Sequence, residues 1–367
     1  MITLLVAAGI SLVFTLFLTP LFARLFRRIG WGQYINADGP RTHQVKRGTP
    51  TMGGIVFIVG AVVGYLLGHW TTGQGPTVSG LLVVYLMVGL ALIGFIDDFM
   101  KTHKRRSLGL GPWQKIAGQV VIAAGFVALA LNFPDEHGLR PASFNISVLR
   151  DIPWLDLATF GLVAGAIVLA IWVTLIVVGA SNGVNLTDGL DGLATGSSIF
   201  SFIAYIVIGF WQFNQWCFSP RLDQDVAATC YMVRDPLDLA TIAAAVTGAL
   251  IGFLWWNTSP AKIFMGDTGS LGLGGGLAAL AILTRTELLL VLVGGLFVIE
   301  VGSVIMQRGY FKLTHGRRIL RASPLHHHFE MLGWGEVTVV VRFWIIAALF
   351  VGAAVGLFYL EWVTRSL

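Results

Sequence analysis

Long apolar runs separated by short polar stretches extend over the whole chain. We count ten apolar segments, at residues 2–23, 52–69, 79–96, 116–132, 157–179, 193–212, 239–256, 270–284, 288–306 and 337–360. Most approach the length of about 20 residues with which an α-helix crosses a bilayer, whereas a transmembrane barrel would show short segments of alternating polarity. The pattern therefore predicts an all-α polytopic membrane protein, with ten transmembrane helices in a single domain that covers residues 1–367.

The composition agrees with this class of protein. Of the 367 residues, 56% are hydrophobic and 12% are charged, where a soluble domain carries about 25% charged residues. The first apolar segment has no basic region before it and no cleavage site after it, so we expect a retained helix rather than a signal peptide. The net charge of +5 follows from topology and does not indicate nucleic-acid binding.

Lysine and arginine are unevenly divided between the two sides of the predicted bundle. The odd-numbered loops and the adjoining helix ends hold most of the 24 basic residues. Because basic residues collect on the cytoplasmic side, we predict that these loops are cytoplasmic and that both chain termini are periplasmic. The loop at about 213–238 then lies outside, where Cys217 and Cys230 either form a disulfide or remain two unpaired thiols.

The polar stretch between the fifth and sixth apolar segments is rich in side chains that can bind a ligand or act in catalysis. Residues 181–196 read SNGVNLTDGLDGLATG and contain asparagines and aspartates but no lysine or arginine. Asn185, Asp188 and Asp191 recur at intervals of three, so on a helical turn they share roughly one face. A turn that only connects two helices does not need carboxylates at this spacing. We therefore interpret this stretch, with Asn182, as a substrate-binding turn at the membrane surface.

An acidic pair ends the third apolar segment, in GFIDDFMK. Asp97 and Asp98 lie close to the predicted C-terminus of a helix, where the macrodipole disfavours negative charge. Two solvated surface carboxylates are the simpler interpretation, but the unfavourable position indicates a functional reason. Lys115, just before the fourth segment, is a candidate partner for the pair.

The loop before the eighth segment brings a further aspartate. It reads NTSPAKIFMGDTGS, and Asp267 precedes an apolar run, so N-capping of the next helix is one interpretation. A loop that only connects two helices does not readily explain Asn257 and Phe264, which lie in the same stretch. The glycines of the following GLGGG, residues 272–276, permit tight packing between membrane helices.

The first and ninth loops contribute cations. The first contains HQVKRGTPTMGG, in which Lys46 offers an ammonium suited to phosphate and Thr51 follows closely. The ninth contains SPLHHHFEMLGW, with His326, His327 and His328 in succession. Consecutive residues cannot easily turn three rings toward one zinc ion and no cysteine is near, so contact between the imidazoles and phosphate is the preferred interpretation.

Taken together, the cytoplasmic loops gather carboxylates, asparagines and cations. Oxygen donors of this kind suit Mg²⁺, which binds one or two carboxylates together with waters and substrate phosphates. Nearby cations would neutralise the charge that moves onto a leaving phosphate. Because a water-soluble phosphate alone needs no bundle of helices, we expect a lipid-borne acceptor. A transporter is less favoured, since the apolar segments carry almost no ionisable residue near their middle.

Five motifs resemble the signatures of the phospho-N-acetylmuramoyl-pentapeptide-transferase family, also called translocase I, within the polyprenyl-phosphate N-acetylhexosamine-1-phosphate transferase superfamily. They lie in order between residues 46 and 329 and read KRGTPTMGG, GFIDDFMK, NGVNLTDGLDGLA, NTSPAKIFMGDTGS and PLHHHFE. The resemblance implies that phospho-N-acetylmuramoyl-pentapeptide passes from UDP-N-acetylmuramoyl-pentapeptide to undecaprenyl phosphate, giving lipid I and UMP in peptidoglycan synthesis, with Mg²⁺ as cofactor. It also implies a location in the bacterial cytoplasmic (inner) membrane, and it permits a homodimer.

The resemblance further implies roles for individual residues. Asp267 would bind the metal ion, Asp97 and Asp98 would handle the lipid phosphate, and Lys115 would help to position phosphates. His326 and His327 would contact the pyrophosphate, and Phe264 would stack on uracil. The nucleotide pocket would be completed by Lys46, Asp188, Asp191 and Asn257. We add Thr51, Asn182, Asn185 and His328 to the expected substrate-binding residues.

Two alternatives remain at this level. The lipid phosphate attacks the sugar-linked phosphorus either directly or after an aspartate has formed a covalent intermediate. We favour the direct route, because an anionic attacker and a metal-bound pyrophosphate leave little work for a protein nucleophile. A related transferase that uses UDP-N-acetylglucosamine would carry the same acidic motifs, although TPTMGG and PLHHHFE favour the muramoyl branch.

Overall fold

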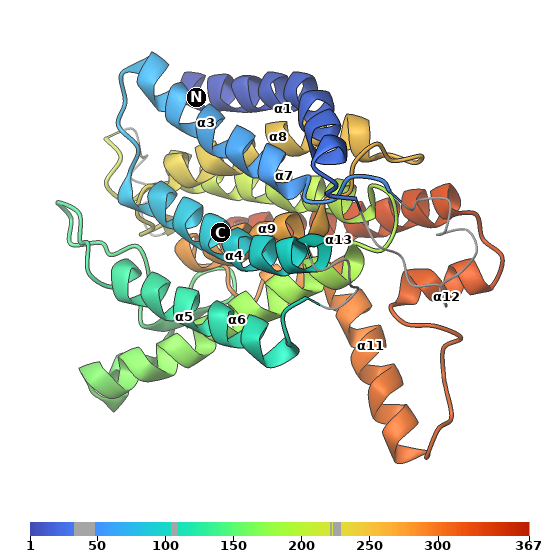
Figure 1. The fold of residues 1–367 in the computed structure, drawn as a ribbon. Coiled ribbons are helices and arrows are strands. Elements are labelled where there is room, and N and C mark those ends of the chain that lie inside the picture. The colour runs from blue at the N-terminus through green and yellow to red at the C-terminus, as the bar shows by residue number, and fades with distance from the viewer. Residues whose placement is uncertain (33–47, 104–108, 221, 223–228, 367) are drawn as a thin grey trace.

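The computed structural model describes the whole chain except residues 33–47, 104–108, 221, 223–228 and 367. The described part is mostly helical, and eight of its helices are long and apolar enough to cross a membrane. These eight are α1 (Ile2–Arg28), α3 (Gly54–Thr72), α4 (Val78–His103), α5 (Pro112–Ala130), α6 (Leu162–Thr187), α7 (Leu193–Asn214), α8 (Pro236–Asn257) and α13 (Glu336–Ser366). The prediction of an all-α polytopic membrane protein is confirmed (Figure 1).

The eighth and ninth predicted segments also form helices, but these are not among the eight. The eighth corresponds to α9 (Gly266–Leu283), which is rich in glycine. The ninth is divided at Gly294 into the short α10 (Leu290–Val293) and α11 (Gly295–Leu313), and a further short helix, α12 (Leu325–Met331), follows. The second half of α11 contains the charged residues Arg308 and Lys312, which make this helix less apolar than the eight. A count of ten membrane spans therefore remains a proposal.

The fifth predicted segment is displaced toward the C-terminus. Residues Leu157–Phe160 form a short 3-10 helix, and α6 begins after Gly161, whose φ of 88° favours glycine. α6 then continues to Thr187, so the interpretation of residues 181–187 as a turn is wrong. Hydroxyl groups along this part bond back to the helix, as Thr187 Oγ1 does to the Gly183 carbonyl at 2.8 Å. The actual turn is confined to residues 188–192.

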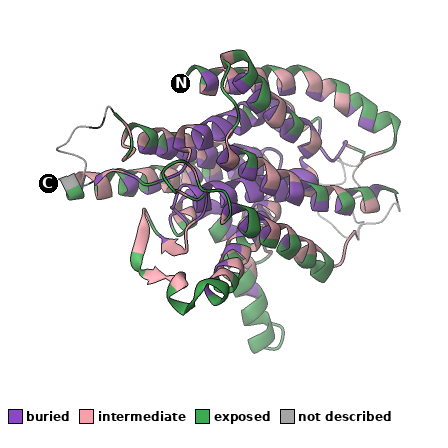
Figure 2. Ribbon diagram, turned by 90° about the vertical axis from the view of Figure 1, so that its left-hand side faces the viewer, coloured by how far each residue is buried: buried purple, intermediate pink, exposed green. Residues whose placement is uncertain are grey.

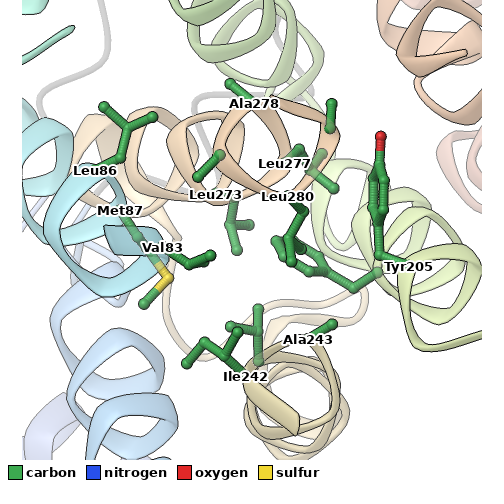
Figure 3. Packing of buried hydrophobic residues seen from close by; sticks show 14 of the residues in the cluster. Val83, Leu86, Met87, Tyr205, Ile242, Ala243, Leu273, Leu277, Ala278 and Leu280 are labelled. Atoms are coloured by element: carbon green, nitrogen blue, oxygen red, sulfur yellow. The ribbon is translucent and has the colours of Figure 1, made fainter. Parts of the chain in front are cut away.

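Helix α9 lies at the centre of the bundle. Every residue from Thr268 to Leu283 is buried. A Cβ atom on Gly274 would lie 2.3 Å from the Ser181 Cα of α6, and one on Gly275 would lie 2.9 Å from the Leu86 carbonyl oxygen of α4. The prediction of tight packing around GLGGG is therefore confirmed. Figure 3 shows the leucines of α9 packed among side chains of α4, α7 and α8.

Both termini lie at the end of the bundle opposite to the 188–192 turn. That opposite end carries an antiparallel hairpin of β1 (Asn145–Ser147) and β2 (Asp151–Asp156) just before α6. Arg150 Nε in the hairpin lies 3.1 Å from Glu361 near the end of α13, and Thr3 Oγ1 at the start of α1 donates to Gln74 beyond α3. Figure 2 also shows the two chain ends on one side.

The loop between α7 and α8 contains a disulfide between Cys217 and Cys230. The disulfide lies near the end of the bundle that holds the chain termini, since Arg150 Nη1 of the hairpin donates to the Cys230 carbonyl. Of the two alternatives for this cysteine pair, the structure supports the disulfide.

Candidate active site

Three aspartates from two helices meet at the end of the bundle that holds the 188–192 turn. Asp97 and Asp98 lie near the end of α4, Asp267 lies in the first turn of α9, and one carboxylate oxygen of each lies within 4.8 Å of the others. We call these three residues the aspartate triad. The two helices approach closely because Gly94 has no side chain: a Cβ atom there would lie 2.1 Å from the Asp267 carbonyl oxygen. Glycine packing between α4 and α9 thus builds the triad.

Two lysines pair with the triad. Lys115 Nζ, in the first turn of α5, lies 2.6 Å from Asp267 Oδ2 and 3.1 Å from Asp97 Oδ2. Lys101 Nζ lies 3.0 Å from Asp267 Oδ2 and 2.5 Å from Asp97 Oδ2. The predicted partnership of Lys115 with the acidic pair is confirmed for Asp97. Lys101 was missed as a site residue, although its spacing of four residues from Asp97 on one helix was a usable signal.

The remaining oxygens of the triad have separate partners. Asp98 Oδ2 accepts hydrogen bonds from the backbone N–H and the hydroxyl of Thr268, both at 2.9 Å. Asp267 Oδ1 accepts one from Asn185 Nδ2 at 2.9 Å. The interpretation of Asp267 as an N-cap is wrong, because α9 begins at Gly266 without a side-chain cap. Asp98 of α4 satisfies a first-turn amide of α9 instead.

The triad fits a divalent cation with a preference for oxygen ligands. Its three carboxylates outnumber the two ammonium groups that pair with them. Mg²⁺ binds through one or two carboxylates and leaves its other positions to waters and phosphates. Because Asp97 and Asp98 are buried, an additional positive charge among them would relieve repulsion that solvent screens only weakly. These residues could therefore hold such an ion.

The chain before α3 packs against the loop before α9. Phe264 N donates to the Pro50 carbonyl and Gly53 N donates to the Phe264 carbonyl, both at 2.8 Å. Thr51 is buried beside the triad, since a Cβ atom on Gly266 would lie 2.9 Å from Thr51 Oγ1 and 2.6 Å from Asp98 Oδ2. The structure thus brings Thr51 and the half-buried Phe264 to the site, whereas Lys46 lies outside the described residues.

Two of the predicted pocket residues brace the loop that carries Phe264. Asn257 Nδ2 donates to the Ile263 carbonyl at 2.9 Å, and Asn257 Oδ1 accepts from Thr195 Oγ1 at 2.6 Å. Asp191 Oδ2 accepts from Ala261 N at 3.0 Å. Both side chains are buried. In this structure they hold the loop in place.

The end of α6 faces the triad. Burial, together with the nearby charges of Asp267 and Asp98, raises the pKa of Asp188 to about 8. Asn182 lies about one turn before Asn185, and its Nδ2 donates to Gln119 Oε1 of α5 at 3.2 Å.

The three histidines have different surroundings. His326 is buried, its Nδ1 lies 3.2 Å from Glu300 Oε1 of α11, and a Cβ atom on Gly189 would lie 2.3 Å from its Nε2. His327 Nδ1 lies 2.7 Å from Glu330 Oε2, and His328 Nδ1 accepts from Arg321 N at 3.0 Å. The structure places His326 against the turn beside the triad. Contact of His327 and His328 with substrate remains a prediction.

Comparison with known proteins shows the family of this chain. The chain matches the model of glycosyl transferase family 4 over residues 80–285, and signature 1 of the phospho-N-acetylmuramoyl-pentapeptide-transferases over residues 46–58. It is 64% identical to the phospho-N-acetylmuramoyl-pentapeptide-transferase of Clavibacter michiganensis over 100% of both chains. It is 56% identical to the enzyme of that name from Pseudarthrobacter chlorophenolicus over 99% of both. The chain therefore belongs to the phospho-N-acetylmuramoyl-pentapeptide-transferase family.

Proposed function

We propose that the protein transfers phospho-N-acetylmuramoyl-pentapeptide from UDP-N-acetylmuramoyl-pentapeptide to undecaprenyl phosphate, giving lipid I and UMP, with Mg²⁺ as cofactor. The observation that carries this proposal is the aspartate triad with its two lysines at one end of a bundle of membrane helices. Donor and acceptor are both anionic, so their reaction needs positive charge between them. Membership of the family points to the same pair of substrates.

The residues of the site divide this work. Asp267 would hold Mg²⁺ with Asp97 beside it, and the ion would neutralise charge on the pyrophosphate when bound. Lys101 and Lys115 lie next to these carboxylates and position phosphate oxygens. An oxygen of the acceptor phosphate attacks the sugar-linked phosphorus, and the bond from this phosphorus to the bridging oxygen breaks, so that UMP leaves with that oxygen and its electron pair. No protein nucleophile is needed, because the acceptor is already anionic.

In this proposal the nucleotide of the donor lies on the side of the triad where Phe264 is found. Phe264 stacks on uracil from a loop that Asn257 and Asp191 hold in place. Asp188 contacts the nucleotide from the C-terminal end of α6. The remaining contacts to the donor come from Lys46, Thr51, Asn182, Asn185, His326, His327 and His328.

An apolar groove of about 400 Å³ offers a place for the polyprenyl chain. Its walls are formed mainly by α6, α11 and residues 287–294 between α9 and α11, and it extends along α6 from Trp172 to Gly183. Gly183 lies two residues before Asn185, which bonds the Asp267 carboxylate. A lipid chain in this groove would therefore bring its phosphate toward the triad while its apolar surface stays out of water.

The proposed reaction requires the triad to face the cytoplasm of a bacterial inner membrane. We propose ten spans, counting α9 and α11, with both termini periplasmic. The distribution of lysine and arginine supports this orientation, and the disulfide then lies on the oxidising side. A C-terminal fusion to a reporter that is active only in the cytoplasm should stay silent, while an alkaline phosphatase fusion should be active. The opposite pattern would refute the orientation.

The function is tested by product formation. Purified protein is incubated with undecaprenyl phosphate, Mg²⁺ and either UDP-N-acetylmuramoyl-pentapeptide or UDP-N-acetylglucosamine, and UMP is measured. We expect UMP release with the muramoyl donor, and loss of release when the acceptor is omitted or Mg²⁺ is chelated. UMP release with UDP-N-acetylglucosamine alone would instead identify the hexosamine branch. Activity that persists in excess chelator would contradict the role of Mg²⁺.

A further inference from the structure

The second half of α11 leaves the bundle. In Figure 1 this helix extends away from the other helices, and the chain returns from its tip to α12. Large apolar side chains on and just beyond it are exposed, including Ile305, Phe311, Leu313 and Ile319. Exposed apolar side chains next to basic ones are typical of a segment that lies at the membrane–water interface.

A basic pocket opens beside this part of α11. It has a volume of about 630 Å³ and lies between the helix and the returning segment 318–323. Four cationic side chains line it, and no carboxylate does: the lining residues are Gln307, Arg308, Phe311, Lys312, Arg318, Arg321, Ala322 and Ser323. The pocket is therefore suited to an anion.

Hydrogen bonds hold the chain around the pocket in place. The side chain of Gln307 is largely buried, and its Oε1 accepts from Ile319 N at 3.1 Å and from Leu320 N at 3.0 Å. Arg321 N donates to His328 Nδ1 and Arg321 Nη1 donates to the Met331 carbonyl, both at 3.0 Å. The returning segment is thus fixed to α11 on one side and to α12 on the other.

The described residues provide no carboxylate partner for most of the positive charge of the pocket. Across the parts of the chain that the structure describes, Arg308, Lys312 and Arg318 form no ion pair with a carboxylate. Like charges gathered around one cavity repel each other and attract anions from solution or from the membrane surface. A bound anion would remove this repulsion.

One face of α11 joins the apolar groove to the basic pocket. Val298, Val301 and Ile305 line the groove, while Arg308 and Lys312 line the pocket. These five positions are spaced by three or four residues, so they lie on the same side of the helix. This face of α11 is apolar along its first part and cationic at its end. A ligand that follows it has an acyl chain and an anionic head.

We propose that this pocket binds the phosphate head group of an anionic glycerophospholipid, such as phosphatidylglycerol. Basic pockets at the cytoplasmic ends of membrane helices attract such head groups. The acceptor undecaprenyl phosphate fits less well, because its phosphate must reach the triad, and none of Arg308, Lys312, Arg318 and Arg321 is bonded to a triad residue in the described structure. The lipid would anchor the tip of α11 and α12 to the membrane surface.

Lipid binding by the full-length protein tests this proposal without any assay of turnover. Delipidated protein in a neutral detergent is titrated with phosphatidylglycerol or phosphatidylcholine, and the bound lipid is quantified by mass spectrometry after repurification. Wild-type protein should prefer phosphatidylglycerol. The variant R308Q/K312Q/R318Q should bind it about a hundredfold more weakly, because each basic side chain near an anionic head group contributes about fivefold. Its binding of phosphatidylcholine should not change.

A matched variant controls for general loss of charge. R24Q/R28Q/R317Q removes the same number of charges from exposed residues outside the pocket, and it should bind phosphatidylglycerol like the wild type. Equal losses in both variants, or no preference in the wild type, would overturn the proposal. Undecaprenyl phosphate or glycerol phosphate is added as competitor. Displacement by the first at equal concentration would assign the pocket to the acceptor, and equally strong displacement by the second would assign it to a free phosphate.

Discussion

Replacing Asp267 by asparagine is expected to lower turnover by a factor on the order of 10³, the loss typical of removing a group that stabilises charge in the transition state. The Asp267 carboxylate touches both lysines of the site and Asn185. The asparagine amide has the same size but lacks the negative charge that would hold Mg²⁺. Its NH₂ group is a hydrogen-bond donor, so it cannot accept from the ammonium groups of Lys101 and Lys115 as the carboxylate does. We therefore also expect half-maximal activity to require more Mg²⁺.

The measurement is a titration of UMP release with Mg²⁺ for the wild type and for Asp267→Asn. Because Asp267 does not cap α9, loss of a cap cannot explain a decrease. Glu136→Gln serves as the control, since this exposed carboxylate lies near the opposite end of the bundle. An Asp267→Asn enzyme with unchanged Mg²⁺ dependence would refute the metal assignment.

Replacing Asp98 by asparagine should lower turnover by about 10²-fold or more if Asp98 acts as a general base toward the acceptor. Mg²⁺ dependence should remain, because Asp267 and Asp97 still supply the one or two carboxylates that Mg²⁺ needs. The residual activity should rise between about pH 5 and pH 7, because the acceptor phosphate loses its second proton near pH 6 without help. The experiment is a pH–rate profile at saturating Mg²⁺ for the wild type and for Asp98→Asn.

The structure offers a second role for Asp98, which a further variant separates from base catalysis. Asp98 Oδ2 accepts two hydrogen bonds from Thr268 and so fixes the start of α9, which carries Asp267. Thr268→Val removes the hydroxyl bond and keeps the volume of the side chain. If Asp98 only positions α9, this variant should share part of the loss, and the pH profiles of the wild type and of Asp98→Asn should be parallel, because both then follow the ionisation of the acceptor phosphate. If Asp98 is a base, Thr268→Val should stay close to the wild type.

Local pattern predicted most of the helices, and it failed where helix ends depend on tertiary contacts. Apolar runs of membrane-spanning length indicate helices, because a bilayer leaves the backbone few other ways to satisfy its hydrogen bonds. The same runs do not show where a helix ends in protein. α6 continues through SNGVNLT because its polar side chains meet partners on neighbouring helices, as Asn182 meets Gln119 and Asn185 meets Asp267.

The sequence alone determined the class of protein and the residue types of the site, because apolar length and the chemistry of carboxylates, lysines and histidines are properties of short stretches. Only the tertiary structure decided which of these groups meet. Asp98 and Thr268 are 170 residues apart in sequence, and they come together because Gly94 lets α4 and α9 approach closely. Lys101 meets Asp267, and Glu300 meets His326, through tertiary contacts of the same kind. No local pattern encodes such register between helices, since it results from the fit of two surfaces.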